Sequence, residues 1–131
     1  MKYLLDVNAL IALGHFEHAF HERVVRWLKA ETAPELVTCP ITELGFVRVL
    51  SQTPNYRSDV ERARLLLGAL KAIPELSFTF LADDQDVSGL PVWVKSGRQT
   101  TDGHLFQLAK AHGAELATLD GKIRGAFLIP G

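Results

Sequence analysis

The chain has 131 residues, of which 47% are hydrophobic and 22% charged, so it is about one domain long and can bury a core without staples. Its formal net charge of −1 argues against a strongly basic protein that coats nucleic acid non-specifically. Cys39 is the single cysteine, which excludes an internal disulfide and fits a reducing compartment. We expect one domain over residues 1–131, with no membrane span or signal peptide, in the cytoplasm.

The first half of the chain alternates between strand and helix patterns. It predicts a strand over residues 2–6, a short helix over 8–13, a helix over 18–31, a strand over 36–39 and a helix that starts at Pro40. Val24, Val25, Trp27 and Leu28 form the apolar stripe of the helix over 18–31, as an amphipathic helix requires. Proline is well suited to a first helical turn.

The second half continues the alternation. It predicts a helix over residues 59–73, a strand over 77–81, a loop region over 82–97, a helix capped by Thr101 and ended by Gly113, a strand over 115–119 and a short edge strand over 127–129. Strands that alternate with helices in this way favour a parallel sheet covered by helices. The order therefore predicts an α/β fold, a three-layer α/β/α sandwich with a short, mainly parallel sheet.

Four acidic residues stand where such folds place their chemistry. Asp6 and Asp120 each follow a short apolar strand, while Glu43 and Asp102 each open a predicted helix. In an open parallel sheet, ligands bind outside the carboxyl ends of the strands, so we expect all four acids to face one crevice. Unit charges about 4 Å apart repel by roughly 4 kcal/mol at an effective dielectric of 20. Such a cluster needs a cation, and a hard divalent ion with oxygen ligands is the natural one.

Each acid also has a purely structural interpretation. Glu43 and Asp102 would complement the dipole of the helix that each opens. Asp6 and Asp120 would close a strand by bonding to their own backbone. Because all four acids are expected at the same edge of the sheet, one shared site explains their positions better than four separate structural roles.

Polar and basic neighbours extend the candidate site. Asn8, Thr42 and Thr101 stand next to the acids and are expected to support the carboxylates through hydrogen bonds. Three basic residues also adjoin the acids in sequence and are expected to contact phosphate groups: Arg98, Lys122 and Arg124.

These residues also carry a family resemblance. Four short motifs, in this order, resemble those of PIN-domain nucleases, and most of all VapC-type toxins of bacterial toxin–antitoxin pairs: Leu5-Asp6-Val7-Asn8-Ala9-Leu10, Thr42-Glu43-Leu44, Arg98-Gln99-Thr100-Thr101-Asp102 and Thr118-Leu119-Asp120. The resemblance spans nearly the whole chain. One departure is Gly103-His104, where similar sequences often have alanine and an aromatic or apolar residue.

The resemblance implies a metal-dependent endoribonuclease that a cognate antitoxin inhibits. It implies Asp6, Glu43, Asp102 and Asp120 as catalytic acids that hold Mg²⁺ or Mn²⁺. We expect Asp6 and Asp102 to be the central ligands, and the other two acids to orient water or bind a second ion. We also expect a symmetric homodimer, because two copies of so small an enzyme would join their basic edges into a longer binding surface for RNA.

Other functions fit less well. A phosphatase of the haloacid dehalogenase type also begins with a strand and an aspartate, but normally has a second aspartate where Asn8 stands. A non-catalytic receiver-like switch would need paired acids after the first strand and a lysine at the end of the last. His15, His18 and His21 recur every third residue and lack the H-E-x-x-H spacing of a helical zinc pair, so they indicate packing.

Overall fold

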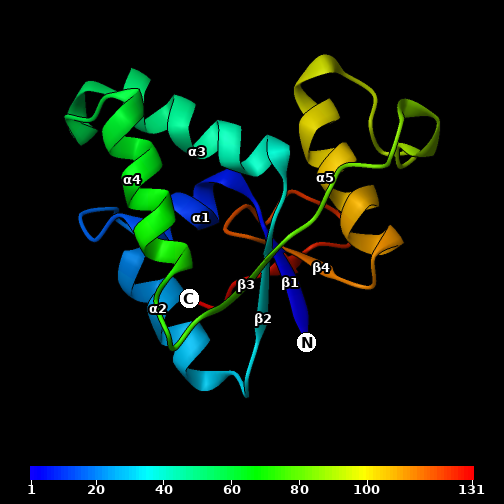
Figure 1. The fold of residues 1–131 in the computed structure, drawn as a ribbon. Coiled ribbons are helices and arrows are strands. Elements are labelled where there is room, and N and C mark those ends of the chain that lie inside the picture. The colour runs from blue at the N-terminus through cyan, green and yellow to red at the C-terminus, as the bar shows by residue number, and fades with distance from the viewer.

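One parallel sheet organises the chain. The computed structural model describes residues 1–131, and its five strands lie in the order β3-β2-β1-β4-β5. The strands are β1 (Lys2–Leu5), β2 (Glu35–Thr38), β3 (Ser77–Phe80), β4 (Glu115–Thr118) and β5 (Phe127–Leu128). Every strand pair is parallel, so all the carboxyl ends lie on one edge, between α3 and α5 (Figure 1).

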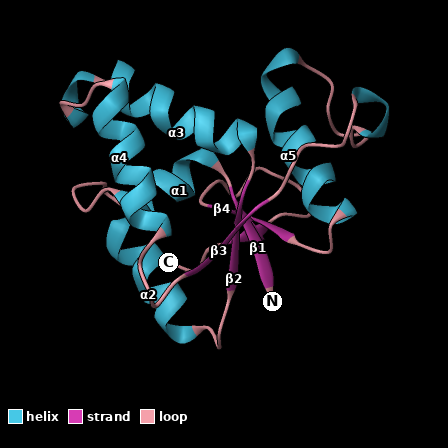
Figure 2. Cartoon of the chain, viewed as in Figure 1, coloured by secondary structure: helices cyan, strands magenta, loops and turns pink.

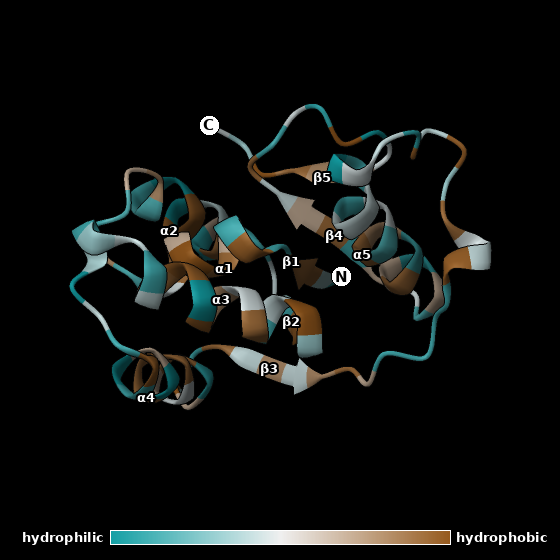
Figure 3. Ribbon diagram, turned by 90° about the horizontal axis from the view of Figure 1, so that it is seen from above, coloured by the Kyte–Doolittle hydropathy of each residue, from teal (hydrophilic) through white to brown (hydrophobic).

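Helices cover both faces of the sheet (Figure 2). They are α1 (Val7–Gly14), α2 (His21–Ala30), α3 (Pro40–Gln52), α4 (Val60–Lys71) and α5 (Thr100–Ala111). Three short 3-10 turns connect them: η1 (Pro54–Tyr56), η2 (Val87–Gly89) and η3 (Gly97–Gln99). Seen from above, α1 to α4 lie on one side of the strands and α5 on the other (Figure 3). None of the helices is long and apolar enough to span a bilayer.

Each face of the sheet has its own hydrophobic core. Side chains alternate along β1: Tyr3 and Leu5 join a cluster of 18 buried residues shared with α1 to α4. Leu4 joins a cluster of nine buried residues shared with α5. This follows from the two-residue period of a strand, and a parallel sheet is normally buried on both faces. The predicted α/β/α architecture is confirmed, and the sheet is parallel throughout.

Two helix starts differ from the prediction. The helix that carries Asp102 begins at Thr100, so Thr101 lies inside it and does not cap it. The 3-10 turn η3 comes directly before, and the side chains of Ser96 and Gln99 close it as a reciprocal capping pair. The helix predicted from residue 18 begins at His21, because the backbone N–H groups of Glu17 and Phe20 bond to imidazole rings within the loop.

The departure at Gly103 has a packing reason. A Cβ placed on Gly103 would lie 2.2 Å from Cγ2 of Val94, closer than two carbon atoms can approach. The segment before η3 therefore lies directly against the first turns of α5, and only glycine leaves room for it. This contact fixes the end of the helix from which Asp102 projects.

Candidate active site at the carboxyl edge of the sheet

Asp6 is the most deeply buried acid of the site. It follows β1 and caps α1, with Oδ1 accepting a hydrogen bond from the Ala9 N–H at 2.8 Å. Oδ2 accepts one from the Thr118 hydroxyl at 2.5 Å, and only 7% of the residue is exposed. Burial raises the pKa of Asp6, and the charges of Asp102 and Asp120 raise it too, against the two hydrogen bonds that lower it.

Asp102 and Asp120 complete a group of three aspartates. Asp102 stands in the first turn of α5 and is half-buried. Burial raises the pKa of Asp102, and the negative charge of Asp120 adds to that shift. Asp120 follows β4, and its Oδ1 accepts a hydrogen bond from the backbone N–H of Lys122 at 2.9 Å. The carboxylates therefore repel one another, as expected of acids that surround one space.

The three aspartates line one groove of about 330 Å³. We call it the acidic groove, and its other lining residues include Asn8, Thr101 and several apolar side chains: Val7, Ile11, Val49, Leu105 and Ile123. The start of α1, the start of α5 and the end of β4 thus meet at the carboxyl edge. Three of the four predicted acids and two of their predicted polar neighbours share this groove.

Glu43 lies elsewhere, so the expectation of one crevice for all four acids is corrected. Its Oε2 accepts hydrogen bonds from Lys71 Nζ at 2.5 Å and from the Thr38 hydroxyl at 2.6 Å. It lines a separate hollow of about 770 Å³ between α3 and α4. The physical reason is Lys71 on α4, whose ammonium group compensates the negative charge of Glu43 in this separate hollow.

The expectation for Thr42 is also corrected, because its hydroxyl belongs to the capping box of α3 and makes no hydrogen bond to any of the acids. Its buried hydroxyl accepts a hydrogen bond from the Cys39 N–H at 3.0 Å and donates to the Cys39 carbonyl at 3.2 Å. The threonines that do support carboxylates are Thr38 and Thr118, which the sequence analysis missed. Each is the last residue of its strand, and a search for hydroxyls at strand ends would have found both.

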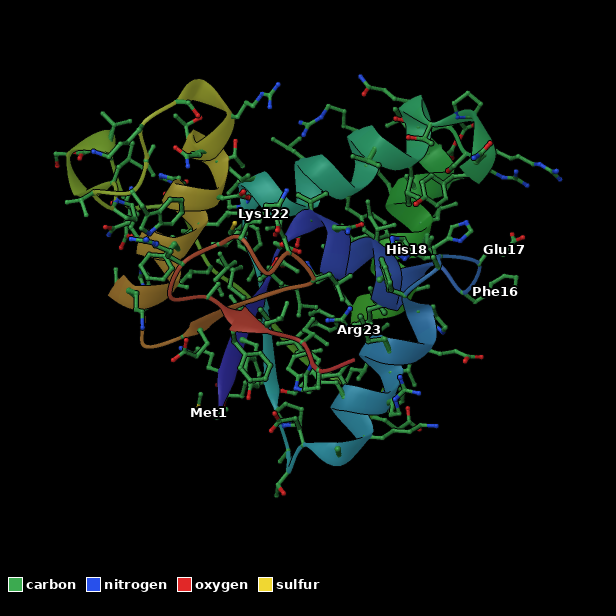
Figure 4. All side chains as sticks on the ribbon, turned by 180° about the vertical axis from the view of Figure 1, so that it is seen from behind. Met1, Phe16, Glu17, His18, Arg23 and Lys122 are labelled. Atoms are coloured by element: carbon green, nitrogen blue, oxygen red, sulfur yellow. The ribbon has the colours of Figure 1, made fainter.

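The remaining predicted residues surround the groove. Asn8 lines it, and its Oδ1 lies 3.0 Å from Nε2 of His18. The three basic residues are exposed: Arg98, Lys122 and Arg124. Lys122 lies at the carboxyl edge of the sheet, between α5 and α3 (Figure 4). No interaction of their side chains with the three aspartates is present.

The donor chemistry of the groove suits a divalent cation. Asp6, Asp102 and Asp120 offer only carboxylate oxygens, which hard ions such as Mg²⁺ prefer. Burial and then mutual repulsion raise the pKa of Asp6 and Asp102, and a cation would relieve that repulsion. As the side chains stand, no group of three or more His, Cys, Asp or Glu residues is close enough to ligate one ion. The carboxylates therefore surround a hollow without forming a closed cage.

Comparison with known proteins gives a consistent result. The family model described as "PIN domain" matches residues 3–126. Ribonuclease VapC38 of Mycobacterium tuberculosis is 41% identical over 123 residues, which are 92% of this chain and 86% of the relative. Ribonuclease VapC39 of the same species is 35% identical over 128 residues, 94% of this chain and 91% of the relative.

Solved structures share the fold at lower identity. M. tuberculosis VapC20, described as a toxin that cleaves the sarcin-ricin loop, superimposes with a TM-score of 0.62 at 14% identity, over 92% of each chain. A chain of VapBC2 from Rickettsia felis, solved with a DNA fragment from its promoter, gives a TM-score of 0.58 at 13% identity, over 98% of this chain and 97% of its own. At such identities the likeness concerns the fold alone.

Proposed function

This chain belongs to the PIN-domain family as a VapC-type toxin endoribonuclease of a toxin–antitoxin pair, and from that premise we propose that its acidic groove is the catalytic centre. Cleavage there would hydrolyse RNA phosphodiester bonds with Mg²⁺ or Mn²⁺ as cofactor. The observation that carries the proposal is the meeting of Asp6, Asp102 and Asp120 in one groove, with the pKa of two of them raised. The family match sets aside the phosphatase and receiver-like alternatives.

The three aspartates have different parts in this proposal. Asp6 is fixed by Thr118 and the first turn of α1, so it provides a rigid ligand with one defined orientation. Asp102 would hold the ion beside it, and Asp120 would orient the attacking water or hold a second ion. A bound divalent ion supplies the positive charge that stabilises the phosphoryl oxygens as they gain charge in the transition state.

Glu43 remains the fourth acid of the proposal, with a condition attached. Its carboxylate is held by Lys71 and Thr38 in the next hollow. To orient water or hold an ion in the acidic groove, Glu43 must first leave Lys71. Lys71 therefore sets how readily the fourth acid takes part.

The remaining parts of the proposal concern RNA, partners and organisation. Arg98, Lys122 and Arg124 would hold the phosphates on either side of the cleaved bond. The chain would act as a single domain in the cytoplasm and as a symmetric homodimer, inhibited by its cognate antitoxin. The R. felis VapBC2 structure is described as bound to a DNA fragment from its promoter. DNA binding is stated for that assembly and is not part of the function proposed for this chain.

RNA cleavage by the purified protein tests the proposal. We expect cleavage with Mg²⁺ or Mn²⁺ and none with EDTA. Asp6→Asn and Asp102→Asn should each abolish activity, and the double variant should be little worse, because groups that act as one unit are not additive. Asp59→Asn is the matched control, since Asp59 caps α4 as Asp6 caps α1. Losses that multiply, or equal activity in EDTA, would contradict the shared centre.

A further inference from the structure

The loop between α1 and α2 carries an unusual number of rings. We call residues 15–20 the aromatic loop; its rings are His15, Phe16, His18 and Phe20. Phe16 is 77% exposed and Phe20 43% exposed, so two large apolar side chains of this short loop are open to contact by another molecule. In Figure 4, Phe16 and Glu17 lie at the outer tip of the loop, while His18 lies closer to α1.

His18 ties this loop to the acidic groove. Its Nδ1 accepts a hydrogen bond from the Phe20 N–H at 3.0 Å, so in the neutral ring the proton is on Nε2, which donates to Asn8 Oδ1 at 3.0 Å. Burial lowers the pKa of His18, as do the nearby His15 and His21, which favours the neutral ring. Asn8 itself lines the groove. The side chain of Asn8 therefore links the ring of His18 to the groove that the three aspartates line.

The rings are arranged in two pairs, and the phenylalanine of each pair is exposed. His15 and Phe16 are stacked, with centroids 6.1 Å apart and planes 10° from parallel. His18 and Phe20 are tilted by 46° at 5.9 Å, and the guanidinium of Arg23 lies 5.6 Å from the Phe20 centroid. Unpaired RNA bases are held by stacking on such rings and on guanidinium planes.

We propose that the aromatic loop is a stacking surface for unpaired RNA bases beside the phosphodiester that the acidic groove cleaves. The inference rests on the proposed function and deepens it, because it places single-stranded nucleotides on named residues. Continuity through Asn8 and His18 is the argument for RNA. Two other hollows have a largely hydrophobic lining, one between α3 and α4 and one between α2 and α4. No residue of the aromatic loop lines either of them, so the loop is separate from these hollows.

Cleavage kinetics on unstructured RNA test this surface. The probes are 10-nucleotide single-stranded RNAs that carry 2-aminopurine, whose fluorescence falls on stacking, assayed with Mn²⁺. Phe16→Ala and Phe20→Ala should each raise KM about 5- to 150-fold, the range for one lost base–ring contact, while kcat stays within a few-fold. The double variant should lose the fluorescence change, and Phe16→Trp should keep it. Leu65→Ala is the control, because Leu65 is 68% exposed on α4.

The outcomes separate this inference from the proposed function. If wild type cleaves RNA and the ring variants, with unchanged melting temperatures, match it in KM, the stacking surface is refuted while the ribonuclease stands. If wild type cleaves none of the RNAs, both fall. If the ring variants cleave normally and lose only inhibition by the antitoxin, the loop belongs to a protein interface and the inference is wrong.

Discussion

Replacing Asp102 by asparagine should abolish activity and yet stabilise the metal-free protein. Asp102 is half-buried beside Asp120, and its pKa is raised by burial and by that neighbour's charge. A carboxyl group whose pKa is higher in the folded than in the unfolded state destabilises the fold at neutral pH. Asparagine keeps the shape of the side chain and removes the charge, so it removes this penalty.

The size of the effect follows from two opposing contributions. Asp102 stands in the first turn of α5, where the loss of a negative charge costs about 0.3–1 kcal/mol. Each unit by which a pKa is raised corresponds to about 1.4 kcal/mol, although solvent screens a half-exposed group. We expect a net gain of about 0.5–1 kcal/mol, or roughly 2–4 °C in Tm for a chain of this size.

Melting curves at pH 7.5 in EDTA and then in excess Mn²⁺ measure both parts. Wild type should gain the more from Mn²⁺, because stabilisation by a ligand follows its affinity for the native state. In EDTA, wild type should also gain stability as the pH falls from 7.5 toward the raised pKa, and the variant should gain less. Glu61→Gln is the control, since Glu61 stands in the first turn of α4 outside the acidic groove. If Asp102→Asn melts lower in EDTA and gains equally from Mn²⁺, the reasoning is refuted.

Three further outcomes are expected. Thr118→Val removes the hydroxyl that donates to Asp6, so the pKa of Asp6 should rise further. Urea unfolding should show that the free energy of unfolding falls by about 1–2 kcal/mol at pH 7.5 and by less at pH 5. An equal loss at both pH values would contradict this. Gly103→Ala should lower stability by about 1 kcal/mol in the same assay, since the clash with Val94 exceeds the gain in helix propensity. Induction of the toxin alone should arrest growth, the antitoxin should restore it, and ultracentrifugation should show a dimer; normal growth with soluble protein, or a monomer at micromolar concentration, would refute the respective part.

Local patterns predicted most of the fold. Apolar runs of four residues and helical spacing are encoded within single segments, so the strands and helices were predicted close to their observed bounds, except for the end of α3, which was not predicted. The position of three acids at the carboxyl edge followed from parallel topology alone. The capping pair of Ser96 and Gln99 shows where local reasoning failed, because Thr101 offered an equally good cap by composition.

Contacts between distant segments were beyond a single sequence. The partner of Glu43 is Lys71, 28 residues away, and the partner of Asp6 is Thr118, 112 residues away. The position of Thr118 at the end of β4 makes it a candidate partner, but nothing in the sequence near Lys71 or Thr118 tells which acid each one meets. The sequence therefore indicated that these acids follow strands and open helices, but not which of them share a groove.

The pairing of β1 with β4 also determines when the acidic groove can form during synthesis of the chain. Tyr3 pairs with Glu115 and Leu5 with Ala117, so the central strand waits for a partner synthesised more than a hundred residues later. Chains emerge from the ribosome N-terminal end first, and contacts between such distant segments form late in folding. Asp6 gains Thr118, and the acidic groove gains Asp120, only after that step. In the proposed function, a chain therefore cannot cleave RNA until translation has passed Asp120 and β4 has joined the sheet.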